Sequence, residues 1–382
     1  MIHFEQAEFD RRRHAVLASM AREGLDGLLL FDPASHYWLT GYDSFGYCFF
    51  QCMVVRADGD LTLLTRAPDL RQARQTSLVR DIRIWVDRAD ADPVRDLRAV
   101  LQDKRLAGGR LGVEWDTHGL TAANGRRLEA GLEGFATLAD ASLLVRRLRL
   151  VKSEAELAFV RRAAELADAA LDAAISQVRP GADEGAILAR MHDAIFEGDG
   201  DYPANPFIIG SGEKALLCRY ASGRRRLAAR DQLTLEFAGV FRQYHACSMR
   251  TLLVGAADDR HRRMFDACRQ ALLSCEERLV PGRTMGEVYA AHAETFDRLG
   301  YGPHRLNACG YSLGAVYAPS WMDWPMFYAD NPVEIAPGMV FFLHMILFDD
   351  TTGHAMTLGR TSVVGPHGAQ PLSRHPLELL VL

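Results

Sequence analysis

Lysine is scarce in this chain of 382 residues: it occurs only at Lys104, Lys152 and Lys214, and arginine supplies the other cations. The arginine bias is typical of a GC-rich genome and carries no functional information. A basic surplus is also missing, because 49 acidic side chains stand against 44 Lys plus Arg and the formal net charge is −5. Binding to phosphate backbones needs such a surplus. The composition therefore argues against nucleic acid as the main partner and gives no signal for a membrane surface.

Paired cysteine motifs and long apolar runs are absent as well. The seven cysteines are scattered, no two have CxxC spacing, and an odd count fits a reducing compartment better than a disulfide framework. No apolar run reaches the roughly 18 residues needed to cross a bilayer, and the first residues, MIHFEQAEFDRRRH, are too charged for a signal peptide. We therefore expect a cytoplasmic protein.

Apolar residues are plentiful, at 48% of the chain, and the length predicts two domains at roughly 150 residues each. Residues 1–148 alternate helical and strand patterns, beginning with an amphipathic helix over 11–23 and an apolar strand over 25–31. Asp32-Pro33 after that strand is predicted as a turn. The alternation predicts an α/β domain with a mixed sheet.

Residues 149–382 show a different organisation. Ser153 with Glu156 three residues on predicts a capped helix start, and apolar residues then recur every three or four positions. A β-hairpin is predicted over 233–255. Further helices are predicted over 184–196, 264–279 and 285–299, and strands over 339–348 and 355–364. This pattern predicts an α+β domain in which helices cover a strongly curved antiparallel sheet.

The hairpin carries a candidate catalytic acid. Alternation in the first strand places Glu236 on the face opposite Leu235 and Phe237. A carboxylate between apolar neighbours is either a satisfied structural partner or a tuned acid or base, because burial raises its pKa toward the range useful for proton transfer or nucleophilic attack. Both interpretations remain open from the residues alone.

His245 and His344 are candidate proton carriers. His245 lies on the returning strand of the hairpin, where alternation places it on the same face as Cys247. His344 lies within the apolar run 340–347, and an apolar setting keeps an imidazole neutral. Each histidine is interpreted either as a structural group bonded to its neighbours or as part of a site with Glu236.

An aromatic segment with one acid follows at residues 319–328 and contains Trp321, Asp323 and Trp324. Ring faces with a carboxylate can enclose a compact cationic or zwitterionic ligand. Aromatic residues are also enriched in subunit interfaces. The segment therefore predicts either a ligand cage or a contact between subunits.

Taken in order, four segments of the chain resemble the creatinase/prolidase ("pita-bread") superfamily. They are Trp38-Leu-Thr-Gly-Tyr42, Leu150-Val-Lys-Ser-Glu-Ala-Glu156, Gly338-Met-Val340 and the closing Leu372-Ser373. The resemblance implies a creatinase-like N-terminal domain over 1–148 and a pita-bread catalytic domain over 149–382. Its members are typically homodimers in which the partner's N-terminal domain closes the site, so residues 49–51 are expected to reach across.

The metallopeptidases of this superfamily hold two metal ions with two Asp, one His and two Glu, and this chain departs at each position. The resemblance aligns them, in order, with Glu236, Cys247, Tyr311, His344 and, more loosely, Gly359. Tyrosine is a poor ligand and glycine none, so the oxygen-rich cage that divalent ions need is missing. We therefore expect no metal and no other cofactor.

Two metal-free members serve as models, creatinase and ectoine hydrolase. The catalytic His of creatinase aligns with Arg219, which counts against that activity. The segments 38–43, 235–239 and 310–311 are more similar to ectoine hydrolase. The resemblance thus implies a metal-independent hydrolase of a non-peptide C–N bond, such as an amidine, in a small zwitterionic solute.

The implied roles follow from the same resemblance. Glu236 is expected to act as base or nucleophile, with His245 and His344 moving protons. Arg219 or Arg250 is expected to pair with the substrate carboxylate. Tyr220, Tyr311, Trp321, Asp323 and Trp324 are expected to line the substrate. The alternatives are an Xaa-Pro dipeptidase-type metallopeptidase with a degraded site, creatinase, and a catalytically silent solute-binding protein.

Overall fold

The computed structural model describes residues 2–220 and 224–382. It divides into two compact units, Met1–Arg149 and Leu150–Leu382, and the sequence predicted the boundary between residues 148 and 149. Within the described ranges, no helix combines the length and the apolar character needed to cross a membrane.

The N-terminal unit is the predicted α/β domain, built on a mixed six-stranded sheet of order β4-β3-β2-β1-β5-β6. Strand β1 pairs antiparallel with β2 and parallel with β5. The strands are β1 (Gly27–Leu30), β2 (Cys52–Arg56), β3 (Leu61–Arg66), β4 (Asp81–Trp85), β5 (Arg110–Val113) and β6 (Thr137–Asp140). The helices are α1 (Gln6–Glu23), α2 (Pro33–Thr40), α3 (Leu70–Thr76), α4 (Pro93–Asp103), α5 (Ala122–Leu132) and α6 (Leu144–Leu150).

The turn predicted at Asp32-Pro33 is wrong, because α2 begins there. The side chain of Asp32 accepts a hydrogen bond from the Ala34 N–H at 3.0 Å, which caps the helix, and Pro33 occupies the first helical position. All eight residues of α2 are buried. A helix that is buried on every side has no amphipathic period, so its sequence gave no helical signal.

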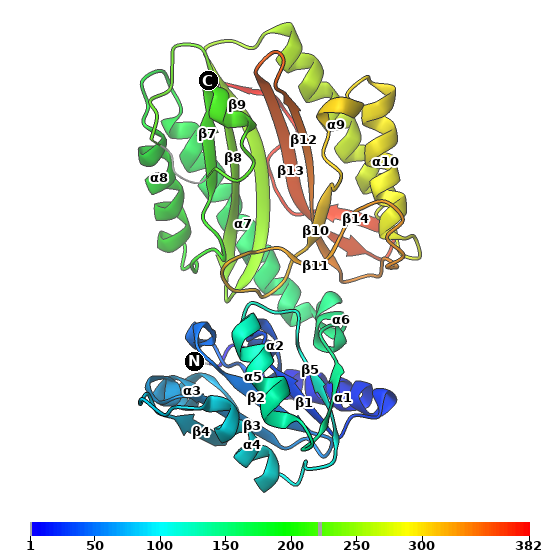
Figure 1. The fold of residues 1–382 in the computed structure, drawn as a ribbon. Helices are drawn as coiled ribbons and strands as arrows, with labels where there is room; N and C mark the ends of the chain where they lie inside the picture. The colour runs from blue at the N-terminus through cyan, green and yellow to red at the C-terminus, as the bar shows by residue number, and fades with distance from the viewer. Residues whose placement is uncertain (1, 221–223) are drawn as a thin grey trace. The chain divides into compact units, whose positions relative to one another are not determined.

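The C-terminal unit is built on one sheet, which is antiparallel along the path β11-β10-β12-β13-β9-β8-β7 (Figure 1). The strands are β7 (Ile208–Ser211), β8 (Asp231–Phe241), β9 (Tyr244–Val254), β10 (Gly310–Ser312), β11 (Asp323–Met326), β12 (Val340–Asp349), β13 (His354–Gly365), β14 (Gly368–Pro371) and β15 (Leu380–Val381). The helices are α7 (Glu154–Gln177), α8 (Glu184–Glu197), α9 (Asp259–Arg278) and α10 (Met285–Arg298). This is the predicted pita-bread fold, and the predicted capping box of Ser153 with Glu156 begins α7.

Helices cover one face of this sheet. Helix α7 packs on β8 and β9, and α9 packs on β12 and β13. At Gly239 a Cβ atom would lie 2.0 Å from the Ala163 carbonyl oxygen, so only glycine permits this close approach of α7 to β8. On β12, Phe341, Leu343 and Met345 belong to the core cluster beneath α9 and α10. Because side chains alternate along a strand, the residues between these positions point to the opposite face.

Candidate active site

Four cross-strand neighbours form a row across the face that α7 and α9 leave uncovered. Glu236 on β8 pairs with Met249 on β9, Met249 pairs with Gly359 on β13, and Gly359 pairs with His344 on β12. Residues paired directly across strands share a face. The predicted acid and the predicted histidine therefore stand at the two ends of one row, and a glycine without a side chain lies between them.

Tyr311 shows that the sheet bends around this row. Strands β10 and β8 are four strand spacings apart, which is about 19 Å in a flat sheet. Nevertheless, the Tyr311 hydroxyl donates a hydrogen bond to Glu236 Oε1 at 3.2 Å, and its ring centroid lies 5.7 Å from that of His344. The uncovered face is thus concave. Trp321 extends the chain of contacts, because its Nε1–H donates to the Tyr311 hydroxyl oxygen at 2.8 Å.

The environment of Glu236 tunes it for proton transfer. Burial raises its pKa from 4.5 to about 7, while the hydrogen bond from Tyr311 and the charge of Arg219 act in the opposite direction. A carboxyl with a pKa near neutral pH both accepts and returns a proton efficiently. Burial and the neighbouring Glu236 raise the pKa of the Tyr311 phenol well above 10.0, so Tyr311 remains a donor.

His344 is a neutral imidazole at this site. Burial lowers its pKa from 6.5 to about 4, and the charge of Arg219 acts in the same direction. Its Nδ1 is buried and has no hydrogen-bond partner among the described residues, and the residue is 8% exposed. A neutral ring whose buried Nδ1 has no protein partner keeps an unused donor or acceptor there.

Arg219 is the cation that acts on this cluster. The side chain is exposed, its Nη2 lies 3.9 Å from Met322 Sδ, and its charge influences the pKa of both Glu236 and His344. An exposed guanidinium next to a buried acid can pair with a substrate carboxylate in bidentate fashion. The role expected for Arg219 in binding a substrate carboxylate stays a prediction.

The structure gives His245 a backbone-binding role instead of the predicted proton shuttle. Its pairing with Val240 places it four residues along β8 from Glu236, or about 13 Å. Both ring nitrogens are occupied: Nε2 accepts from the Ala204 N–H at 3.0 Å, and Nδ1 donates to the Gln243 carbonyl at 2.8 Å. Burial also lowers its pKa to about 4. His245 therefore fixes a loop and has no free nitrogen for catalysis.

The predicted role of Arg250 fails for a different reason. Arg250 pairs with Leu235, so it lies on the helix-covered face, opposite to Glu236. Its Nη1 donates to the Gly359 carbonyl at 2.9 Å, and Arg250 is 2% exposed. A buried side chain on that face cannot reach a substrate over Glu236, so Arg219 is the remaining candidate of the two.

Three of the predicted lining residues make contacts with groups other than Glu236. Asp323 on β11 pairs with Ser312, the residue after Tyr311, at an irregularity of the β10–β11 pairing. Trp324 packs against the core cluster under α9 and α10. The Tyr220 hydroxyl accepts a hydrogen bond from Lys214 Nζ at 2.9 Å. Hydrogen bonds join Tyr311 to Glu236 and, through Tyr311, join Trp321 to the same cluster.

His292 is a buried histidine that the sequence analysis did not single out. It lies on α10, is 1% exposed, and its Nδ1 has no hydrogen-bond partner in the described ranges. Burial lowers its pKa to about 3, and the charge of His344 acts in the same direction. Val288, His292 and Phe296 recur every fourth residue, so this spacing could have revealed that His292 faces the core.

The side chains at the five aligned metal positions do not fit a pair of divalent ions. Glu236 supplies the only carboxylate among them, and burial raises the pKa of the Cys247 thiol, which disfavours the thiolate that binds metals. Within residues 2–220 and 224–382, His, Cys, Asp or Glu side chains converge in a group of three or more only at Asp258, His261 and His354. That group contains none of the aligned positions.

Tyr311→Phe tests the link between the phenol and the acid. The hydrogen bond from Tyr311 favours the ionised form of Glu236, so its loss is expected to raise the pKa of Glu236 above about 7. Infrared titration of the carboxyl band measures this pKa, and Glu236→Gln assigns the band. Tyr328→Phe, at a half-exposed tyrosine, is the matched control. An unchanged or lower midpoint in Tyr311→Phe contradicts the prediction.

Comparisons with known proteins agree with this architecture. The family model for "Metallopeptidase family M24" matches residues 158–366, and that for the "Creatinase/Prolidase N-terminal domain" matches residues 12–151. The prolidase structure from Thermococcus sibiricus superposes with a TM-score of 0.88 at 18% identity, over 98% of this chain and 99% of that one. At that identity the likeness shows the fold alone.

Two curated relatives align along nearly the whole chain. The ectoine hydrolase of Halomonas elongata is 26% identical over 396 residues, which cover 99% of this chain and 98% of the relative. The Xaa-Pro dipeptidase of Pyrococcus furiosus is 20% identical over 370 residues, which cover 97% of this chain and 99% of the relative. The chain is thus similar both to an enzyme named for a non-peptide substrate and to one named for dipeptides.

Proposed function

The chain belongs to metallopeptidase family M24 as a hydrolase of that family, and from this premise we propose that it cleaves a non-peptide C–N bond in a small zwitterionic solute without a metal ion. The observation that carries the proposal is the donor set on the concave face. Glu236, a single tuned carboxyl, lies at the position that the resemblance aligns with the first of the four metallopeptidase carboxylates. At the other four aligned positions this chain has a thiol, a phenol, an imidazole and a glycine without a side chain.

The chemistry assigned to Glu236 follows from its surroundings. The ionised carboxylate takes a proton from water while the water oxygen adds to the amidine carbon, and it returns that proton to the nitrogen as the C–N bond breaks. His344, whose buried Nδ1 has no protein partner, stabilises the tetrahedral intermediate by a hydrogen bond. Direct attack by a Glu236 oxygen on the same carbon is the alternative route, in which water later hydrolyses the covalent intermediate.

The substrate class follows from charge and size. The exposed Arg219 supplies a cation for a substrate carboxylate, and the Trp321 and Tyr311 rings present apolar and π surface beside Glu236. A small molecule that carries a carboxylate and an amidinium matches these groups. The Halomonas elongata relative is named for such a solute, which supports the proposal.

An Xaa-Pro dipeptidase is the competing function. The Pyrococcus furiosus relative and the family description favour it, because the relative is named for dipeptides and the family for metallopeptidases. It requires that the concave face bind metal through Glu236, Cys247 and His344. The two functions therefore differ in substrate and in their dependence on a metal at that face.

A combined binding and turnover experiment separates them. Chelator-treated protein is screened by thermal shift with ectoine, creatine and Xaa-Pro dipeptides, and hydrolysis of each compound is followed with and without added Mn²⁺ or Zn²⁺. A ligand at one hundred times its Kd stabilises the native state by about 2.7 kcal/mol. A cyclic amidine is expected to stabilise the protein and to be hydrolysed without added metal. Dipeptide hydrolysis that needs added metal overturns the proposal, and binding of the amidine without turnover indicates a silent solute-binding protein.

A further inference from the structure

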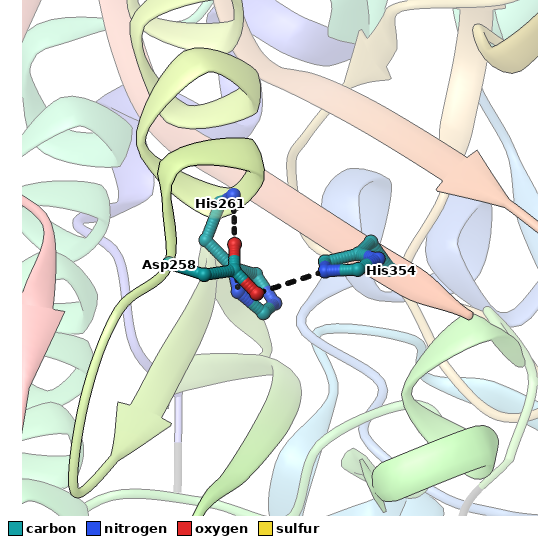
Figure 2. Close-up of side chains that lie close together, drawn as sticks. All are labelled: Asp258, His261 and His354. Carbon is teal, nitrogen blue, oxygen red and sulfur yellow. Dashed lines mark hydrogen bonds and ion pairs between the residues drawn. The ribbon is translucent and has the colours of Figure 1, made fainter. Parts of the chain in front are cut away.

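Three side chains at the start of α9 and β13 form a compact cluster, which Figure 2 shows. Asp258 is the N-cap of α9, and its Oδ1 accepts the His261 N–H at 2.8 Å. His261 Nδ1 lies 3.1 Å from Asp258 Oδ1, and His354 Nε2 lies 3.0 Å from Asp258 Oδ2. The two imidazole centroids are 4.6 Å apart. One carboxylate is thus flanked by two histidine nitrogens.

The hydrogen bonds of Gln232 fix the tautomer of His261. The Gln232 amide nitrogen donates to the carbonyls of Gly212 and Gly353, at 3.0 and 2.7 Å. Its Oε1 accepts from the Ala355 N–H at 2.9 Å, so the amide cannot be flipped. His261 Nε2 lies 3.0 Å from the same Oε1 and must therefore be the donor. In the neutral ring this leaves a lone pair on Nδ1, which faces Asp258.

The same argument applies to His354. Its Nδ1 lies 3.0 Å from the Thr352 carbonyl oxygen, which can only accept, so Nδ1 carries the proton. The lone pair of the neutral ring is then on Nε2, which also faces Asp258. Two nitrogen lone pairs and a carboxylate converge on one another. The exposed Arg230 reaches Asp258 Oδ2 at 3.9 Å but does not bond the two ring nitrogens, and acceptors at such distances repel unless a cation lies among them.

We propose that Asp258, His261 and His354 form a binding site for one divalent transition-metal ion of the zinc class, separate from the concave face. Imidazole nitrogens with one carboxylate suit Zn²⁺ and its neighbours better than Mg²⁺ or Ca²⁺. Each histidine also donates its second ring N–H to a carbonyl oxygen, which is the arrangement that orients metal-binding histidines.

The size of the cluster matches a single ion. The three ligand atoms lie within 4.8 Å of one another. Ligands bound at about 2.1 Å in tetrahedral geometry are about 3.4 Å apart, so small side-chain shifts complete the site. A cavity of about 220 Å³, lined by both histidines, Arg230 and Gly353 among others, leaves room for water as a further ligand.

The bound ion would connect three elements of the C-terminal unit. Asp258 and His261 belong to the start of α9, His354 opens β13, and Gln232 joins the site from β8. Gln232 precedes Glu236 by four residues, roughly 13 Å along the strand. The metal therefore stabilises the contact between the sheet and the start of α9. This structural role does not depend on the function proposed for Glu236.

Metal binding by the purified full chain tests the site with Zn²⁺ and Co²⁺ as probes. After chelation and dialysis, one Zn²⁺ per chain is expected to bind and to raise Tm by roughly 5 °C or more at one hundred times Kd. Co²⁺ is expected to give a visible absorption band from nitrogen ligation. His261→Ala and His354→Ala are expected to abolish both signals, and His367→Ala, at an exposed histidine, is the matched control.

Variants on the concave face separate this inference from the proposed function. Zn²⁺ binding that persists in Glu236→Gln and His344→Ala but is lost in His261→Ala supports the metal site at Asp258, His261 and His354. Binding that survives in the double variant His261→Ala/His354→Ala and is lost in Glu236→Gln overturns it and indicates a metallopeptidase-like site instead. A Kd weaker than about 10 µM for both probes also overturns it, because protons on the two histidines then occupy the cluster in place of a metal ion.

Discussion

Glu236→Gln is expected to lower kcat by ~10²- to 10⁴-fold, the range that a positioned acid or base contributes. The glutamine keeps the shape of the side chain and an oxygen that accepts the Tyr311 hydrogen bond, so the fold is expected to persist. Because burial sets the pKa of Glu236 at about 7, the native rate is expected to rise as the pH increases through that value. The variant is expected to lose this limb of the profile. Steady-state kinetics on the amidine that stabilises the protein measures both effects.

Glu213→Gln, at an exposed carboxylate, makes the same chemical change outside the site and is expected to leave kcat unaltered. Near-native turnover in Glu236→Gln, or an unchanged pH limb, contradicts the role assigned to the carboxyl. Single-turnover reactions in H₂¹⁸O then separate base from nucleophile. Label in the Glu236 peptide indicates covalent attack, because a base never exchanges its own oxygens.

The pattern of the hairpin predicted the fold better than it predicted the site. Alternation correctly placed Glu236 on the face opposite Leu235 and Phe237, and His245 on the same face as Cys247. It did not show that His245 lies opposite Val240, because register depends on the turn, and here a two-residue turn at Arg242 and Gln243 sets it. Two residues predicted to share a face of a sheet therefore need not lie close together.

Curvature is the second property that the pattern could not supply. Tyr311 meets Glu236 because the sheet bends enough to bring β10 over β8, across three intervening strands. No local signal in the sequence encodes that distance. The resemblance to the superfamily nominated Tyr311. The aromatic spacing alone grouped Trp321 with Asp323 and Trp324, and it did not show that Trp321 donates to Tyr311. Local chemistry thus identified candidate residues, and the strand topology decided which of them meet.

Two buried groups of the hairpin are expected to change the pH dependence of stability in opposite directions. The pKa of His245 falls from 6.5 to about 4 in the native state, so the unfolded chain binds the extra proton between these values. Its contribution, roughly 3 kcal/mol at about 1.4 kcal/mol per pKa unit, is present above pH 6.5 and is lost as the pH falls through 4. The pKa of Glu236 rises from 4.5 to about 7, so its contribution is present below 4.5 and is lost as the pH rises through 7.

The slope of the unfolding free energy against pH separates the two groups. Urea unfolding followed by circular dichroism between pH 5 and 6 measures it. His245→Gln is expected to lower the slope by about 1.4 kcal/mol per pH unit, and Glu236→Gln is expected to raise it by a similar amount. His367→Gln and Glu213→Gln are the matched exposed controls. Because a slope counts protons, it is unaffected by the stability that each substitution removes at all pH values. Changes of slope in the same direction in the two variants would therefore contradict the pKa shift assigned to one of the two groups.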